Sequence, residues 1–169
     1  MSMRRFLRWI VAGGGVALLA ACGSLPSDSA KVGAGETAAD LSARGKGNDV
    51  VLFALGLIET GYRFGGKNPE AGLDCSGMVG YVYRHAADIP LQGSAADLAR
   101  KGKSVERERM RPGDLVFFNT RNKPKSHVGI YIGGNRFVHA PSSRGKVRTE
   151  SLSNPWFAAR YEGARTYLD

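Results

Sequence analysis

An α+β domain is the fold class that the sequence predicts, and three observations support it. Apolar residues recur at helical spacing in the first half of the chain, above all from Met78 to Ala86. Short apolar or alternating segments, which are typical of strands, fill the second half from Leu115 onward. Turn residues separate these later segments. Helices followed by strands indicate N-terminal helices packed on a mostly antiparallel sheet.

The start of the chain has the features of an export signal. Three arginines precede an apolar segment at residues 9–21, which is shorter than the roughly 20 residues that span a bilayer. The segment ends in Leu-Ala-Ala-Cys, which resembles a bacterial lipobox with Cys22 as the lipidated new N-terminus. A plain secretory signal is the alternative. We expect residues 1–21 to be a lipoprotein signal peptide and Cys22 to carry a lipid anchor. Gly23 favours the outer membrane, with the domain facing the periplasm.

The charge of the remaining chain narrows its partners. The leader holds three arginines and no acid, so residues 22–169 carry 21 basic and 15 acidic side chains, a net charge of +6. This charge suits anionic lipid, an acidic polysaccharide or a peptide rich in carboxylates. Nucleic acid would fit by charge alone, but export and the scattered basic residues speak against it. A solvated basic surface is the simpler interpretation.

The segment that follows predicts a tether and then one domain. Residues 22–47 are rich in Gly, Ala and Ser without periodicity, which predicts a flexible tether before a domain at 48–169. Asn48 or Asp49 would cap a first helix that stops at Gly61. Later helices are expected at residues 75–87, 94–102 and 154–157, and strands at 115–118, 127–132, 136–140, 147–151 and 163–168.

Cys75 is the residue on which the predicted chemistry depends. Asp74 is a natural N-cap, so Cys75 falls in the first helical turn, where free N–H groups and the helix dipole favour a thiolate. With Cys22 acylated, Cys75 has no partner for a disulfide, although the compartment is oxidising. A thiolate is a nucleophile that needs a histidine to take up and return its proton.

Two of the three histidines are placed to serve this cysteine. His85 lies ten residues further along the same helix, roughly 15 Å away at 1.5 Å per residue. A three-residue turn at 133–135 would instead pair His139 with Gly129, and this register puts His127 on the same face. A two-residue turn would send the two histidines to opposite faces. We predict that His127 is the base and that His139 orients its ring, although the roles could be exchanged.

A zinc site is the other interpretation of one cysteine and two histidines. These residues come from three separate elements, lack the short-spaced pair that is typical of structural zinc, and have no fourth ligand placed by the sequence. We therefore expect neither a metal nor an organic cofactor. For either histidine taken alone, a half-buried structural role is as good an interpretation as a catalytic one.

Four short segments follow one another in the order and spacing of a known family. They are Leu-Asp-Cys-Ser-Gly at 73–77, Arg-Pro-Gly-Asp-Leu-Val-Phe-Phe at 111–118, His-Val-Gly-Ile-Tyr-Ile at 127–132 and Phe-Val-His-Ala at 137–140. Together they resemble the NlpC-type cell-wall cysteine endopeptidases, whose fold is papain-like. The resemblance covers about residue 48 to the C-terminus. It implies a peptidoglycan endopeptidase that hydrolyses amide bonds of stem peptides through a thioester acyl-enzyme, without a cofactor.

The resemblance also implies roles for individual residues. These are the nucleophile Cys75, the base His127, the third polar residue His139, an active-site wall at Tyr62, and substrate contacts at Asp74 and Ser76. Two positions depart from the family pattern. Phe64 stands where tryptophan is frequent, and Leu91-Gln92 stands where an arginine is common, which puts one substrate contact in doubt.

Other functions stay open on the sequence. A catalytically silent lipoprotein could use the same pocket to hold wall peptide, although binding does not require a nucleophile. An amidase or acyltransferase on the same fold would use the same three side chains. The sequence does not distinguish cleavage of D-alanyl–diaminopimelate cross-links from cleavage of γ-D-glutamyl–diaminopimelate bonds.

Overall fold

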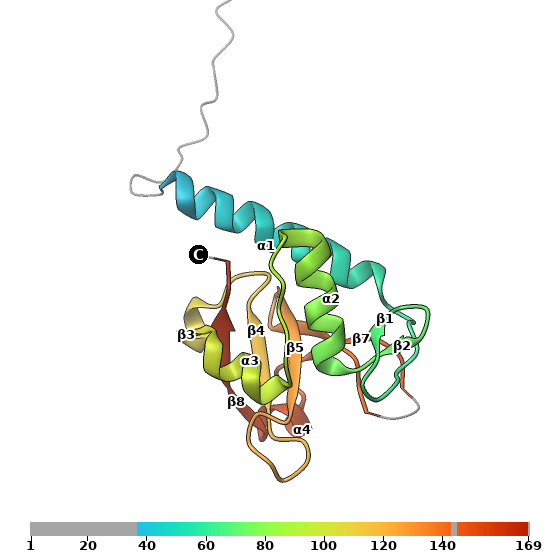
Figure 1. The fold of residues 1–169 in the computed structure, drawn as a ribbon. Helices are drawn as coiled ribbons and strands as arrows, with labels where there is room; N and C mark the ends of the chain where they lie inside the picture. Colours follow the sequence, from blue (N-terminus) through green and yellow to red (C-terminus); the bar gives the residue numbers. More distant parts are fainter. Residues whose placement is uncertain (1–36, 143–144, 169) are drawn as a thin grey trace, which may run out of the picture. The chain divides into compact units, whose positions relative to one another are not determined.

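Residues 37–142 and 145–168 are the part of the chain that this computed structural model describes (Figure 1). The predicted signal peptide, the lipidation site Cys22 and most of the predicted tether lie outside the described residues. Residues 35–169 form a unit of their own, and every feature reported below belongs to it. Among the helices of the described residues, none is long and apolar enough to cross a membrane.

Helix α1, Ala38–Gly56, begins earlier than the sequence suggested. The Thr37 hydroxyl oxygen accepts the Asp40 N–H, and the Asp40 carboxylate accepts the Thr37 N–H, which together form a capping box. The prediction that the tether extends to residue 47 and that Asn48 or Asp49 caps the helix is therefore wrong. The helix also ends before the predicted stop at Gly61.

Gly47, inside α1, is a glycine that close packing requires. Its backbone lies against Pro112, and a Cβ at Gly47 would stand 2.3 Å from the Pro112 carbonyl oxygen. No side chain larger than hydrogen fits there. The high glycine content of this segment suggested a linker, but at position 47 the glycine is needed because the backbone of Pro112 packs against it.

The remaining elements agree with the predicted α+β order. They are β1 Lys67–Asn68, β2 Gly72–Leu73, α2 Cys75–Ala87, α3 Ala95–Lys101, β3 Lys103–Val105, the 3₁₀ turn η1 Arg107–Arg109, β4 Leu115–Phe118, β5 His127–Gly133, β6 Arg136–His139, β7 Arg148–Ser151, α4 Pro155–Ala158 and β8 Tyr161–Thr166. Strands β1, β2 and β3 are too short to leave a periodic pattern, and the sequence did not predict them.

One antiparallel sheet with strand order β3-β8-β4-β5-β6-β7 forms the centre of the domain. Helices α1 and α2 lie across one face of it (Figure 1). That face and the helices bury a large core with Met78, Val82, Phe117 and Ile130 among its members. The opposite face buries a smaller, largely aromatic cluster: Val116, Phe118, Phe137, Leu152, Phe157 and Ala164.

The hairpin of β5 and β6 has the predicted register but reaches it differently. Ile130 pairs with Val138 and Tyr131 with Phe137, so continuation of the register sets His139 opposite Gly129. The chain turns at Gly134-Asn135, both at positive φ, and a bulge before Gly133 supplies the extra residue. The two histidines therefore share a face, as predicted.

Candidate active site

Asp74 fixes the position of Cys75 at the start of α2. One carboxylate oxygen of Asp74 accepts the Gly77 N–H at 2.7 Å and the Ser76 hydroxyl at 3.1 Å. The other accepts the Gly65 N–H at 2.9 Å, which ties the preceding glycine loop to the helix. The predicted N-cap is confirmed, and Cys75 is the first residue of the helix.

The surroundings of the Cys75 sulfur favour the neutral thiol. Burial raises the pKa of the Cys75 thiol, and the Asp74 carboxylate raises it further. Hydrogen bonds from the N–H groups of Val128 and Ser76, together with the charge of Arg121, act in the opposite direction. The sequence predicts that the helix start favours a thiolate, and the N–H of Ser76 acts in that direction, but burial and the Asp74 carboxylate outweigh it.

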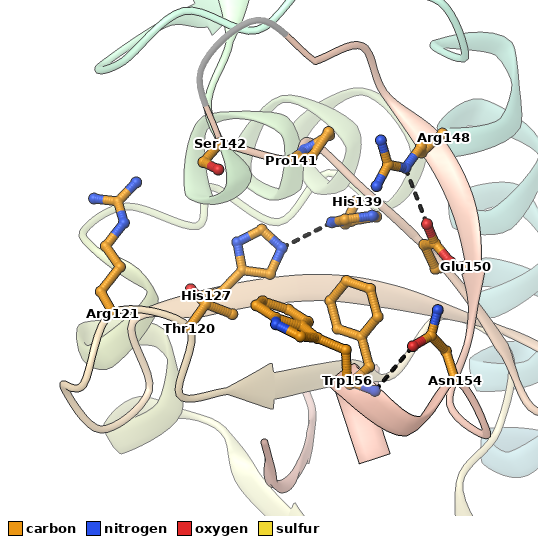
Figure 2. Close-up of a pocket in the computed structure, with 11 residues that line it drawn as sticks. Thr120, Arg121, His127, His139, Pro141, Ser142, Arg148, Glu150, Asn154 and Trp156 are labelled. Atoms are coloured by element: carbon orange, nitrogen blue, oxygen red, sulfur yellow. Dashed lines mark hydrogen bonds and ion pairs between the residues drawn. The ribbon is translucent and has the colours of Figure 1, made fainter. Parts of the chain in front are cut away.

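The same contact places the cysteine beside the first histidine. Val128, whose N–H is directed at the sulfur, is the residue that follows His127 in β5. His127 in turn meets His139, with 2.8 Å between His127 Nε2 and His139 Nδ1 (Figure 2). The ring planes are nearly perpendicular, at 89°. The structure thus pairs the two histidines and sets Cys75 against the residue that follows His127 in the chain.

The position of the proton in the hydrogen bond between His127 Nε2 and His139 Nδ1 decides whether His127 can act as a base. If His127 Nε2 carries the proton and donates it to His139 Nδ1, His127 Nδ1 keeps a lone pair. If His139 Nδ1 donates instead, His127 Nδ1 holds a proton and cannot accept another. Among residues 37–142 and 145–168, no group forms a hydrogen bond with the buried His139 Nε2, so none of them fixes the protonation of that nitrogen.

Both imidazoles are held neutral by burial. His127 is 7% exposed and His139 is 1% exposed. Desolvation lowers the pKa of His127 to about 4, helped by the positive charge of Arg121 and opposed by Asp74. Burial lowers the pKa of His139 even further, with smaller effects in the same direction from His127 and Arg148. The rings of Phe137 and Phe157 lie 5.2 and 5.3 Å from the His139 ring.

The histidine geometry does not suit the zinc alternative. The two facing nitrogens are 2.8 Å apart and share a hydrogen bond, whereas two ligands of one zinc ion would each point at the metal. Across residues 37–142 and 145–168, no cluster of three or more His, Cys, Asp or Glu side chains is arranged to hold a metal ion.

The other predicted site residues lie on two sides of the cysteine. Asp74 and Ser76 line a cavity of about 340 Å³ next to the start of α2, together with Lys67 and Arg84. Tyr62 lies outside this cavity. Its hydroxyl faces the guanidinium of Arg121 at 3.5 Å. His85 is exposed and stacks on Phe53 of α1, away from the cysteine as expected.

Sequence reasoning missed a second cavity and its cation. This cavity, also of about 340 Å³, is lined by both histidines and by Thr120, Arg121, Pro141, Ser142, Arg148, Glu150, Asn154, Trp156 and Phe157 (Figure 2). Arg121 belongs to the loop between β4 and β5, which the sequence described only as polar. Its return toward Tyr62, 59 residues earlier in the chain, leaves no local signal.

Comparison with known proteins finds a family that matches more than half of the chain. The model of the family described as NlpC/P60 matches residues 59–166. Murein DD-endopeptidase MepS/Murein LD-carboxypeptidase of Escherichia coli is 42% identical over 107 residues, which are 63% of this chain and 55% of that protein. Gamma-DL-glutamyl hydrolase of Bacillus subtilis is 40% identical over 119 residues, 70% of this chain and 29% of that protein.

A solved structure shares the fold. The NlpC/p60 domain of the peptidoglycan hydrolase SagA superposes with a TM-score of 0.62 at 32% identity, covering 71% of this chain and 97% of that domain. The match to each of the two relatives above spans little more than half of its length or less. The part that matches holds the cysteine and both histidines.

Proposed function

The chain belongs to the NlpC/P60 family, and from this we propose that it is a peptidoglycan endopeptidase that hydrolyses amide bonds in wall stem peptides. The observation that carries the proposal is the buried His127–His139 hydrogen bond next to the N–H that faces the Cys75 sulfur. A binding protein has no need of a nucleophile supported in this way. The names of the relatives, which are wall-peptide and γ-glutamyl hydrolases, support the same reaction class.

The proposed mechanism starts from a neutral pair. As the Cys75 sulfur attacks the peptide carbonyl carbon, its proton passes to His127 Nδ1, so that thiolate and imidazolium form together with the new C–S bond. Backbone N–H groups at the start of α2 stabilise the oxyanion. His127 then gives its proton to the leaving amine, and a thioester is left on Cys75. Water, activated by the same ring, hydrolyses the thioester.

His139 serves this mechanism as a positioning residue. By accepting the Nε2 proton of His127 across their 2.8 Å contact, it would select the tautomer that leaves His127 Nδ1 free to take the thiol proton. The aromatic rings around His139 keep water from competing for that bond. His139 touches neither the substrate nor the attacked carbon in this scheme.

Digestion of purified sacculi tests the proposed function. Wild-type protein should release soluble peptides, and mass spectrometry of these peptides identifies the bond, a D-alanyl–diaminopimelate cross-link or a γ-D-glutamyl–diaminopimelate bond. Cys75→Ala should lose on the order of 10⁴-fold or more in rate, with an unchanged thermal unfolding midpoint as the control for folding. Digestion by a folded Cys75→Ala protein at the wild-type rate rules out Cys75 as the nucleophile. Absence of digestion by the folded wild-type protein rules out the enzyme and leaves the silent binding lipoprotein. Release of amidated or transferred products instead of hydrolysed ones points to the acyltransferase alternative.

A second part of the proposal concerns location. The lipobox-like sequence before Cys22 supports a lipid-anchored envelope protein, with the domain in the periplasm at the outer membrane. Cys22→Ser should move the protein from the membrane fraction to the soluble fraction, or stall its processing. An equal membrane share for wild type and Cys22→Ser in fractionated cells would show that Cys22 is not the anchor.

A further inference from the structure

The cavity beside His127 is separate from the one beside the cysteine. His127 lines the cavity that contains Arg121 and Trp156, whereas Asp74 and Ser76 line the other. In acyl transfer the acyl group stays on the nucleophile and the amine leaves next to the base that protonates it. The cavity beside His127 is therefore on the amine side of the cleaved bond. This assignment rests on the proposed function.

The two arginines that line this cavity, Arg121 and Arg148, differ in their partners. Arg148 Nε forms an ion pair with a Glu150 carboxylate oxygen at 3.1 Å. Arg121 lies at the other side of the histidine pair (Figure 2). It contacts the Tyr62 hydroxyl at 3.5 Å, and its guanidinium carbon lies 5.9 Å from the centre of the Phe64 ring. Within residues 37–142 and 145–168, no carboxylate pairs with Arg121.

Arg121 is near enough to the reacting atoms to act on a substrate there. Arg121 and His127 line the same cavity (Figure 2), and the positive charge of Arg121 lowers the pKa of both the Cys75 thiol and the His127 imidazole. A planar guanidinium offers two parallel N–H donors, which match the two oxygens of a carboxylate. The Phe64 and Tyr62 contacts hold the group at the rim without using up its charge.

We propose that Arg121 binds a free carboxylate on the amine-side residue of the substrate, next to the amide nitrogen that is cleaved. The acceptor diaminopimelate of a stem-peptide cross-link carries such a carboxylate on the same carbon as the reacting nitrogen. The exposed ring of Trp156, at the far side of the cavity, packs against the apolar part of that residue. Arg121 is thus a specificity residue that selects acceptors with a carboxylate over amidated ones.

A binding experiment tests this subsite without turnover. The sequence has two tryptophans, Trp9 and Trp156, and Trp9 lies in the expected signal peptide, so a protein that starts at residue 22 has Trp156 as its tryptophan reporter of the cavity. Titration with meso-diaminopimelate should give a saturable change in Trp156 emission. Its diamide should bind about 10- to 100-fold more weakly, the loss expected for one charge-assisted contact. Arg121→Ala should weaken binding of the acid by the same factor, and Arg121→Lys by less.

Lys123→Ala is the matched control, because Lys123 is a cation of the same loop that does not line this cavity. It should leave both affinities unchanged. Equal affinity for acid and diamide, or unchanged affinity in Arg121→Ala, overturns the assignment of Arg121. Arg121-dependent binding by a protein that does not digest sacculi would leave the subsite standing and remove the proposed function. Digestion without discrimination between free and amidated acceptors would do the reverse.

Discussion

The two faces of the central sheet bury very different surroundings. The face under α1 and α2 packs mostly aliphatic side chains and carries no histidine of the site. The other face surrounds His139 with aromatic rings, 5.2 Å away for Phe137 and 5.3 Å for Phe157. Aromatic rings exclude water and offer no charge, so they keep the histidine pair neutral. The helix-covered face holds the larger core, and the other face sets the protonation state of His127 and His139, the proposed base and its partner.

Removal of the base should have the largest effect on function. His127→Ala is expected to slow hydrolysis by about 10²- to 10⁴-fold, because no other group near the sulfur takes its proton. The fold should survive, since the helix-covered core is untouched. Steady-state rates on a stem-peptide substrate measure the loss, with thermal unfolding as control. Wild-type turnover in His127→Ala would transfer the role of base to His139.

The helix-covered face is tested by Phe117→Ala in β4. Phe117 is fully buried, so its truncation should cost about 3–5 kcal/mol in the free energy of unfolding. The acid limb of the pH–rate profile should not move, because Phe117 belongs to the helix-covered core and not to the aromatic cluster around the histidine pair. Phe157→Ala is the matched change on the other face. It should shift the acid limb of the pH–rate profile upward, because water reaches His139. If both variants move the profile equally, the two faces do not have separate roles.

The pH dependence sharpens the comparison further. The pKa of His127 is lowered from its usual 6.5 to about 4, so the folded state binds fewer protons than the unfolded state between these values. Stability from this group is present at pH 7 and is lost as the pH falls through this window, by roughly 3 kcal/mol in all. Urea unfolding from pH 7 to 3.5 measures it, with His127→Gln as the control that removes this part of the slope. An acid limb of kcat/KM near 6.5 instead of about 4 would contradict the neutral pair.

The smallest effect should come from the positioning residue. His139→Asn keeps a side-chain oxygen that can accept from His127, so it should retain more activity than His139→Ala. Neither change should equal His127→Ala. Iodoacetamide labelling of Cys75 across pH gives a second measurement. The pH midpoint of labelling should stay above the usual thiol pKa of about 8.5 in the wild type, in His139→Asn and in His139→Ala. Labelling that is already complete at neutral pH in the wild type would indicate a resting thiolate.

The sequence predicted the parts of the molecule that depend on local signals. Asp74 and Ser94 are the N-caps of α2 and α3, and they predict where these helices start because a capping residue directly precedes its helix in the chain. The β5–β6 register followed from the turn residues. The start of α1 was missed although Thr37 and Asp40 form a local capping box, because the glycine-rich composition of residues 22–47 indicated a linker. The close approach of Gly47 to Pro112, which accounts for one of these glycines, joins positions far apart in sequence.

The site divides in the same way. Cys75, His127 and His139 were found because their residue types and spacing are unusual in themselves. Arg121 was not found, because an arginine in a polar loop is ordinary until the loop folds back on Tyr62. The neutral thiol was also missed. Its cause is burial, which depends on everything packed around the sulfur rather than on the helix start alone.

The ties between distant segments around Cys75 have a consequence for the order of folding. The loop before α2 is held by Glu59 N–H to Val147 carbonyl and Tyr62 N–H to Gly145 carbonyl bonds, which join segments that lie far apart in sequence. Such contacts close large loops and form late. We expect α2 to form early and the cysteine to meet its histidine only when the last strands have docked. A chain whose last strands have not docked would then have Cys75 in place without its histidine, so the proposed peptidase activity would begin only when the domain is complete.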